Sequence, residues 1–483
     1  MKQFILLLLI FILSCQSPFS TEPTNDDLFS VSHNYNGDKI YHPTPVTIEW
    51  SNITIKQFKE VLIERSVVYH DSVVWMNIAH IQDSLQTTYT DTIDDDITFQ
   101  YRVRLVDQNS QFIHALSAPL VIPNVTSLKV PYHYSDPQEA FNSKMIDDGD
   151  TIKIYPGLYE GNFQFQDKNI TIRSTTIPEI TLLAGEKRLG SVVEINAGRL
   201  EGLTLIGGKA LFGGGISARG TASIKNCIIR NNRAINDRNT KSQIYPNGKG
   251  GGVYLQDAAD IIKCKIIHNN SEEEGGGILS DGNNSIVNCT IYNNNSQSVK
   301  VGAGLFQYGG QLLIQNTKFK RNKTHGNGGA IFINASAEIT NCLFEKNKSD
   351  RGGALTVGEE GDVKITNCVF NRNWSFSSAF SGAIINQGEI VIMNTIVWNN
   401  SGTKDFKLYA RYAQYTVSDE FRIVVGLGNL KLNPLFVNEE VGNYHLAENS
   451  PCVDKGHPDG RYNDVDGSRN DLGIYGGPFG NIW

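Results

Sequence analysis

Seven charged or titratable side chains lie just before glycine-rich phrases that repeat along the sequence. They include acids and bases and are Lys249, Glu272, Glu273, Glu274, His325, Asp350 and Arg351. Carboxylates, imidazoles and amines are the groups that proteins use for proton transfer and for recognition of polar ligands. If the turns that carry them stack, residues one or two periods apart share one face. We therefore hypothesise a site here; the alternative is that these charges only solvate surface loops.

A second group of acids lies near the C-terminus and consists of Asp464, Asp466 and Asp471. Carboxylate oxygens are the ligands that Ca²⁺ prefers, so this group is a candidate calcium site. Its spacing does not match a complete EF-hand loop. An acidic structural turn without a metal is the alternative interpretation.

The elements that must position these residues are repeats. A nine-residue phrase occurs seven times between Ile224 and Asn400, with a period of about 26 residues in its last six copies. Its central position is Cys or Thr, at Cys227, Cys264, Cys289, Thr317, Cys342, Cys368 and Thr395. Each copy begins with Ile three residues earlier and closes with Asn five residues later, at Asn232, Asn269, Asn294, Asn322, Asn347, Asn373 and Asn400. Such regularity indicates stacked structural repeats.

Two short strand-like phrases in each period leave no room for a helix. The second phrase is rich in Gly and Ala and ends in an apolar residue, as in Gly-Gly-Gly-Ile278 and Gly-Gly-Ala-Leu355. Parallel stacking of such coils places each residue roughly 4.8 Å from its counterpart one period away. Ile, Cys and Phe then form inward ladders, while Asn at the bends tolerates left-handed backbone and bonds to the next Asn.

This pattern resembles the right-handed parallel β-helix family, the architecture of pectate lyases and polygalacturonases. Ile339-Thr-Asn-Cys-Leu-Phe344 and Ile365-Thr-Asn-Cys-Val-Phe370 carry the resemblance most clearly. It implies an all-β solenoid of exported bacterial proteins, and it indicates fold more firmly than activity. The catalytic phrases Trp-Ile-Asp-His, Asn-Thr-Asp and Gly-His-Gly are absent from the sequence, as is the pectin esterase pattern.

The N-terminus has the features of an export signal. Residues 1–15 begin with a charged start and an apolar run, and Ile12-Leu-Ser-Cys15 resembles a bacterial lipobox that would place a lipid on Cys15. An ordinary signal peptide with a chance Cys is the alternative. Residues 16–27 are polar and predict a tether. We expect an outer-membrane or cell-surface lipoprotein of a Gram-negative bacterium, bound to the membrane through its N-terminal lipid only.

Short alternating strands fill residues 28–123 and resemble a fibronectin type III β-sandwich. Trp50 on an early strand and Tyr101 on a late strand are predicted core residues. Residues 124–147 are predicted to form a linker and a short capping helix, which begins near Ser135-Asp-Pro137. The β-helix is expected over 148–432, and residues 433–483 form a C-terminal closing segment.

Two segments interrupt or follow the repeats. The longest interval between copies implies a loop over Arg233–Gly248, and loops on repeat scaffolds often bind ligands. Residues 404–422 mix aromatic and cationic side chains, which suits either sugar stacking or an ordinary closing coil.

Composition excludes several classes. The chain has 483 residues and a net charge of −7, and its basic group Lys318, Lys320, Arg321 and Lys323 is interpreted as a solvated face, so no nucleic acid partner is expected. Five of the seven cysteines belong to the inward ladder, where Thr substitutes twice, so we predict buried free thiols without disulfides or a zinc site.

The sequence as a whole predicts a surface-anchored β-helix protein that binds extracellular polysaccharide. The glycan-binding candidates are Lys249, Glu273, Glu274, His325, Asp350 and Arg351. Ca²⁺ is the one candidate cofactor. A polysaccharide lyase or glycoside hydrolase is the first alternative, and a passive adhesin or spacer is the second.

Overall fold

The computed structural model describes residues 31–33, 44–51, 58–69, 72–93, 100–116, 127–143, 146–236, 247–298, 302–401, 413–419 and 426–480. The predicted signal peptide and tether, including Cys15, lie outside these ranges. The chain divides into two compact units, Met1–Val125 and Thr126–Trp483, and each is described by itself.

The N-terminal unit consists of two antiparallel sheets. One contains, in spatial order, β1 (Val31–His33), β2 (Thr44–Trp50) and β5 (Thr88–Ile93). The other contains β4 (Ser72–Ile81), β3 (Phe58–Tyr69), β6 (Tyr101–Asp107) and β7 (Phe112–Leu116).

Side chains of both sheets form one apolar core. Ile48 and Trp50 of β2 pack with Ile63 of β3 and Val103 of β6. Tyr101 is fully buried, and its hydroxyl donates to Asp91 Oδ2 at 2.8 Å. The predicted core positions of Trp50 and Tyr101 are therefore confirmed, while the resemblance to a fibronectin type III domain remains a prediction.

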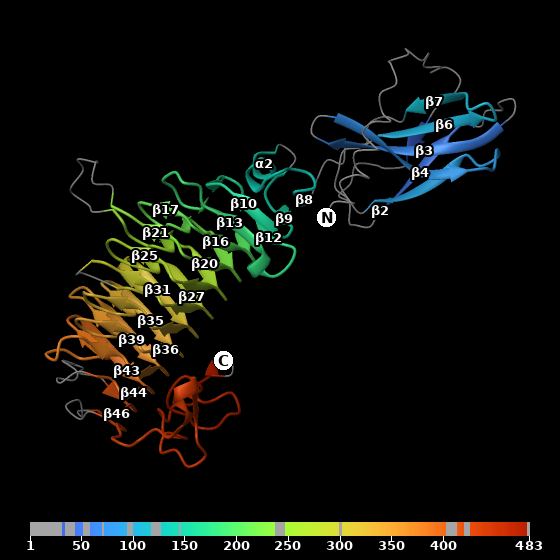
Figure 1. Cartoon of the computed structure of the whole chain (residues 1–483). Helices are drawn as coiled ribbons and strands as arrows, with labels where there is room; N and C mark the ends of the chain where they lie inside the picture. Colours follow the sequence, from blue (N-terminus) through green and yellow to red (C-terminus); the bar gives the residue numbers. More distant parts are fainter. Residues whose placement is uncertain are drawn as a thin grey trace. The chain divides into compact units, whose positions relative to one another are not determined.

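The C-terminal unit is a parallel β-solenoid (Figure 1). Its first two complete turns carry three short strands each, and the turns from β15 (Arg199–Glu201) to β42 (Ile384–Asn386) carry four. One turn consists of β18 (Ile216–Ala218), β19 (Ser223–Lys225), β20 (Ile228–Arg230) and β21 (Arg233–Ala234). Strands at equal positions in successive turns pair in parallel, as Ile224 does with Ile261. The four resulting sheets are named below by these four strands.

The two longer sheets run almost the full length of the solenoid. The β19 sheet contains β8 (Ser127–Val130), β9 (Thr151–Ile154), β12 (Thr171–Ser174), β15 (Arg199–Glu201), β19, β23 (Asp260–Ile262), β27 (Asn284–Val287), β31 (Gln311–Gln315), β35 (Ser336–Thr340), β39 (Asp362–Thr366), β43 (Glu389–Met393) and β45 (Ala413–Gln414). The β20 sheet contains β10 (Gly157–Glu160), β13 (Thr181–Ala184), β16 (Thr204–Ile206), β20, β24 (Lys265–Ile267), β28 (Thr290–Tyr292), β32 (Lys318–Lys320), β36 (Leu343–Glu345), β40 (Val369–Asn371), β44 (Ile396–Trp398) and β46 (Val417–Ser418).

The two shorter sheets complete each turn. The β18 sheet contains β11 (Phe163–Phe165), β14 (Val193–Ile195), β18, β22 (Val253–Asp257), β26 (Ile278–Gly282), β30 (Leu305–Gly309), β34 (Ile331–Ile333), β38 (Leu355–Val357) and β42 (Ile384–Asn386). The β21 sheet contains β17 (Lys209–Ala210), β21, β25 (Asn270–Ser271), β29 (Asn295–Ser296), β33 (Lys323–Thr324), β37 (Lys348–Ser349) and β41 (Trp374–Ser375).

The Cys and Thr positions form a buried ladder between the β19 and β20 sheets. The backbone amide of Cys289 donates to Thr317 Oγ1 at 3.2 Å, and the amide of Cys342 donates to Cys368 Sγ at 3.4 Å. Burial raises the pKa of the Cys289 thiol to about 12, so that thiol stays protonated. All six cysteines in the part of the chain that the structure describes are free, as predicted. Thr replaces Cys because a hydroxyl accepts the same backbone amide.

The closing asparagines form a second buried ladder. Asn347 Oδ1 accepts from the backbone and side-chain amides of Asn322, both at 3.0 Å. Asn347 Nδ2 donates to Phe319 O at 2.8 Å and to Asn373 Oδ1 at 2.9 Å. The same pattern continues from Asn232 to Asn400, so each side chain ties its own turn to both neighbours.

The first turn is covered by helix α2 (Pro137–Asn142), as the sequence predicts. Its N-cap is Asp136, whose carboxylate accepts from the amides of Gln138 and Glu139, and Phe141 packs against Phe165 with ring centroids 5.3 Å apart. The solenoid begins earlier than residue 148, because β8 already pairs in parallel with β9. A 3₁₀ turn, η1 (Pro178–Ile180), precedes β13.

The C-terminal segment, residues 433–480, folds back over the outer side of the β20 sheet. It contains β47 (Phe436–Asn438), η2 (Glu439–Val441), β48 (Asn443–Leu446) and η3 (Gly460–Tyr462). Tyr444, Cys452, Leu472 and Ile474 pack against the outward side chains of β36, β40 and β44, which are Leu343, Val369 and Ile396. Figure 1 draws the segment in red beside the last turns. It thus covers a side of the solenoid, which the sequence did not predict.

The two ladders differ in how well they tolerate substitution. Asn347→Ala leaves the buried amide of Asn322 without its acceptor and removes the side-chain donor to the Phe319 carbonyl, so we expect a loss of about 2–4 kcal/mol in unfolding free energy. Cys342→Thr keeps a side-chain donor for the carbonyls of Ile314 and Thr340, which the Cys342 thiol contacts, and should cost less than about 1 kcal/mol. Denaturant unfolding of both variants measures the difference. Equal stability losses would contradict these roles.

Candidate functional site

Three consecutive turns present the same arrangement of side chains around the asparagine ladder. The triplets are Arg321-Asn322-Lys323, Lys346-Asn347-Lys348 and Arg372-Asn373-Trp374. The central Asn is buried in each triplet, and the first residue has a left-handed backbone with φ between 54° and 57°. The third residue begins a strand of the β21 sheet. Because the Asn points inward, both flanking side chains point outward.

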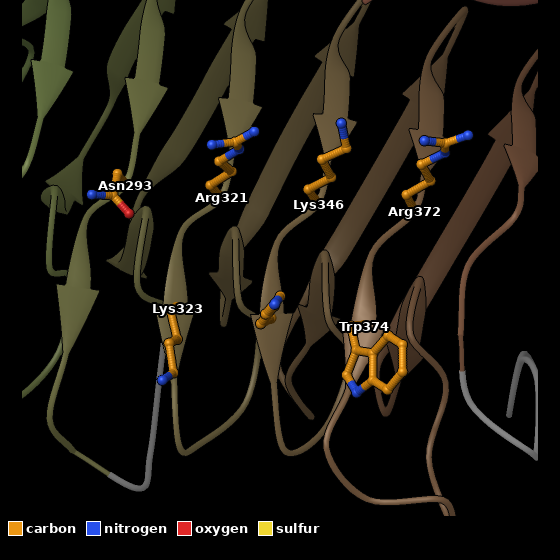
Figure 2. A pocket seen from close by; sticks show the side chains of 7 residues that line it. Asn293, Arg321, Lys323, Lys346, Arg372 and Trp374 are labelled. Carbon is orange, nitrogen blue, oxygen red and sulfur yellow. The ribbon is translucent and has the colours of Figure 1, made fainter. Parts of the chain in front are cut away.

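These side chains line a groove of about 450 Å³ whose walls are Asn293, Arg321, Lys323, Lys346, Lys348, Arg372 and Trp374. We call it the cationic groove. Figure 2 shows Arg321, Lys346 and Arg372 in one row, with Lys323 and Trp374 in a second row beside it. Five of its seven side chains carry a positive charge, so the groove is suited to an anionic ligand.

Stacking forces like charges together in this groove. Lys323 pairs in register with Lys348, which pairs in register with Trp374. Neighbouring strands lie about 4.8 Å apart, and like charges directly opposite each other destabilise a sheet. Lys323 and Lys348 of two adjacent turns therefore face each other at a cost to stability, and this pair adds to the positive charge of the groove.

Carboxylates neutralise part of the groove. Lys346 Nζ lies 3.2 Å from Oε1 of Glu345, whose side chain is 2% exposed. Arg372 forms ion pairs with Glu439 and Glu440 of the C-terminal segment. Within the described ranges, the side chains of Arg321 and Lys348 have no acidic partner, so at least two cations remain available to a ligand.

Exposed aromatic rings lie beside the charges. Trp374 is 52% exposed and Phe376 is 43% exposed. Phe376 stacks with the His325 ring at 5.6 Å between centroids, and Lys323 Nζ lies 5.7 Å from the Phe376 ring. Flat apolar rings next to cations are suited to a ligand that has both apolar faces and negative charges.

The structure pairs the predicted site residues but does not gather them into one cluster. Lys249 Nζ lies 2.9 Å from Glu274 Oε2, and the two side chains are only 13% and 9% exposed. Glu272 accepts from Arg233 at 2.7 Å and from the Asn236 amide at 2.9 Å. Glu273 accepts from Asn236 Nδ2 at 2.7 Å. These carboxylates therefore fasten adjacent turns and the base of the predicted loop.

The remaining predicted residues lie farther along the stack. His325 Nδ1 is 3.9 Å from Asp350 Oδ1, and both side chains are exposed. The Arg351 guanidinium lies 4.5 Å from the Phe380 ring centroid. Of this set, only His325 is linked to the cationic groove, through Phe376. The glycan-binding role of these residues stays a prediction.

The predicted loop and the aromatic segment after the repeats are only partly described. Arg233 belongs to strand β21, so the insertion begins after Ala234, and residues 237–246 lie outside the described ranges. Most of residues 404–422 also lie outside them.

The three C-terminal acids serve as turn acceptors. Asp464 Oδ2 accepts from the Asp471 amide at 3.0 Å, Asp466 Oδ1 accepts from the Ser468 amide at 2.9 Å, and Asp471 Oδ1 accepts from the Asp454 amide at 2.7 Å. Burial raises the pKa of Asp464 to about 6. Across the described ranges, no three Asp, Glu, His or Cys side chains come together as a metal-binding group. The calcium-binding role of these acids therefore stays a prediction.

Sequence reasoning missed the cationic groove because it considered Lys318, Lys320, Arg321 and Lys323 as one solvated turn. Lys320 instead pairs with buried Glu345 at 2.8 Å, and Arg321 and Lys323 line the groove with residues of the next two turns. The available signal was periodic: a cation precedes the ladder Asn in three successive copies, whereas the earlier and later copies have Asn or His there.

Comparisons with known proteins agree with the solenoid. Residues 214–388 match the family model described as "Right handed beta helix region". The search of curated proteins found no match to this chain. No helix in the described parts of the chain is long and apolar enough to cross a membrane.

Solved structures with similarity to the chain include two bacterial pectate lyases. Pectate lyase Pel3 from Pectobacterium carotovorum is 12% identical, with 68% of this chain and 85% of that chain covered and a TM-score of 0.16. Pectate lyase PelI from Erwinia chrysanthemi in complex with tetragalacturonic acid is 12% identical, with coverage of 75% and 92% and a TM-score of 0.18. Because these TM-scores are low, the assignment of the β-helix fold is based on the observed strand pairing and on the family match.

The Lys249–Glu274 pair allows its structural role to be measured. Glu274→Ala leaves the Lys249 ammonium largely buried without a counter-charge, so we expect a loss of about 3 kcal/mol in unfolding free energy. The double variant Lys249→Met with Glu274→Leu should lose much less, because it removes both charges. Denaturant unfolding gives both values. A Glu274→Ala variant of unchanged stability would show that the pair does not fasten these turns.

Proposed function

We propose that the solenoid binds a linear, carboxylate-bearing polysaccharide along the cationic groove. The groove carries this proposal, because five cations and an exposed Trp lie over three adjacent turns of a chain whose net charge is −7. A uniformly basic protein would attract any polyanion, whereas here the positive charge is local. The ligand class follows from that local charge together with the neighbouring rings.

The periodicity of the groove supports a polymeric ligand. Each turn repeats one pair of outward side chains at the strand spacing of about 4.8 Å, and a polymer of acidic sugars also presents its charges at regular intervals. Repeat proteins typically bind ligands over such extended surfaces. Affinity is then the sum of several exposed contacts, each of which is modest and sensitive to salt.

The proposal also covers where the protein acts. A lipid on Cys15 would hold the chain at the outer membrane or cell surface. Extracellular polysaccharide would then be accessible to the groove.

The anchor is tested independently of binding. Cys15→Ala removes the thiol that would carry the lipid, so the protein should move from the membrane fraction to the soluble fraction after expression in a Gram-negative host. Detergent partition of the wild type and the variant measures this. Unchanged membrane partition would rule out lipid attachment at Cys15.

Binding is tested with variants of the groove. Lys346→Ala with Lys348→Ala should weaken binding of fluorescently labelled polygalacturonate about tenfold or more, because two charge-assisted contacts are lost. The matched control is Lys225→Ala with Lys364→Ala, which removes a partly exposed and an exposed lysine from the outer face of the β19 sheet and should leave binding unchanged. Binding should weaken as salt increases.

Binding of polygalacturonate, its methyl ester and an oligonucleotide, together with an assay for unsaturated uronate products, distinguishes polysaccharide binding from nucleic acid binding and from lyase activity. Methyl-esterified polygalacturonate, which lacks the charges, should bind weakly, and a single-stranded oligonucleotide should bind no better than polygalacturonate. Tighter binding of the oligonucleotide, or equal effects of the groove and control variants, would overturn the proposal. Release of unsaturated uronate products that depends on the groove lysines would replace binding by lyase activity.

A further inference from the structure

One end of the cationic groove already holds a carboxylate from the same chain. Arg372 Nη1 donates to Glu440 Oε2 at 2.7 Å, and Arg372 Nη2 donates to Glu440 Oε1 at 2.5 Å. Two parallel N–H···O bonds between a guanidinium and a carboxylate are the fork geometry by which Arg recognises carboxylates. Arg372 therefore holds a carboxylate in the orientation that a uronate ligand would need.

Glu439 and Glu440 are held very differently. Glu439 accepts from Asn371 Nδ2 at 2.9 Å, Asn399 Nδ2 at 3.1 Å and Arg372 Nη2 at 3.0 Å, so three side chains fix it. Glu440 is 70% exposed, and within the described ranges its carboxylate forms ion pairs with Arg372 alone. The Arg372 guanidinium lowers the pKa of Glu440, so this carboxylate is ionised at neutral pH. Glu439 thus anchors η2, while Glu440 occupies Arg372 from the solvent side.

We propose that Arg372 is a carboxylate subsite of the groove and that Glu440 occupies it until a ligand carboxylate takes its place. This inference rests on the proposed function, because it assumes that an acidic chain enters the groove. The exchange replaces one exposed carboxylate on Arg372 by another, and η2 stays attached through Glu439. Arg372 keeps a carboxylate partner and the displaced Glu440 carboxylate is solvated by water, so the free-energy cost of the exchange is small.

The arrangement predicts how ligand length affects binding. Arg321 and Lys348 have no acidic partner in the described structure, so a short acidic chain binds there first. A longer chain reaches Arg372 and must displace Glu440 to gain contacts with the third turn of the groove. Glu440 therefore reduces the advantage of longer ligands, and its removal should increase that advantage.

The matched variants are Glu440→Gln and Glu448→Gln. Glu448 is an exposed carboxylate of the same C-terminal segment, so its variant makes the same change in net charge. Glu440→Gln should bind polygalacturonate about two- to fivefold more tightly than the wild type, the range set by the loss of one exposed ion pair. Glu448→Gln should bind as the wild type does, and both variants should unfold at the wild-type temperature.

Adding Arg372→Lys tests the recognition geometry. Lys keeps the charge but lacks the fork, so Glu440→Gln with Arg372→Lys should lose most of the gain seen in Glu440→Gln alone. Methyl-esterified polygalacturonate should show no gain with any of these variants. Isothermal titration with each probe on the full chain gives all the values.

The outcomes separate the two proposals. If the wild type does not bind polygalacturonate, or if the groove lysines do not matter, the proposed function fails. If binding depends on those lysines but Glu440→Gln and Glu448→Gln behave alike, the function stands and the Arg372 subsite is wrong. If Glu440→Gln lowers the unfolding temperature without tightening binding, Glu440 is only an anchor of the C-terminal segment, which also overturns the inference.

Discussion

The buried ladder of asparagine amides is the interaction on which the rest of the solenoid depends. Each Asn side chain satisfies a backbone amide and a backbone carbonyl of the preceding turn and donates to the Asn side chain of the following turn, so the bends cannot shift independently. Without these amides, a sharp corner in a narrow core would leave backbone donors and acceptors unpaired. The ladder also fixes the direction of the residues on either side of it, because an inward Asn forces its neighbours outward.

Because of that constraint, residues that repeat next to the Asn in the sequence become neighbours on the surface of the solenoid. Whatever flanks the Asn appears in a straight row along the solenoid, one strand spacing apart. Arg and Lys occupy this row at three turns, whereas Asn231, His268, Asn293 and Asn399 occupy it elsewhere. The charge is therefore confined to one stretch of an otherwise polar edge. A regular row of charges is better matched to a polymer than to a compact ligand.

The C-terminal segment affects both the core and the groove. Its apolar residues cover Leu343, Val369 and Ile396, and its Glu439 and Glu440 reach Arg372 at the edge of the covered region. Asn341 donates to the carbonyls of Ile474 and Gly476, so the bends of the repeat hold this segment as well. The same stacked scaffold thus positions the cations and the carboxylates that face them.

The sequence by itself determined the repeat, the buried free thiols, the left-handed bends and the helix that covers the first turn, because each follows from local residue types repeated at a fixed period. Outward Leu343, Val369 and Ile396, which follow Lys265, Thr290 and Lys318 at the same position, carried a readable sign of a covering segment. Only the tertiary structure decided which charges meet. Lys249 and Glu274 became a fastening pair, and Arg321, Lys346 and Arg372 became one groove, because stacking brings together residues that are a full period apart in the chain.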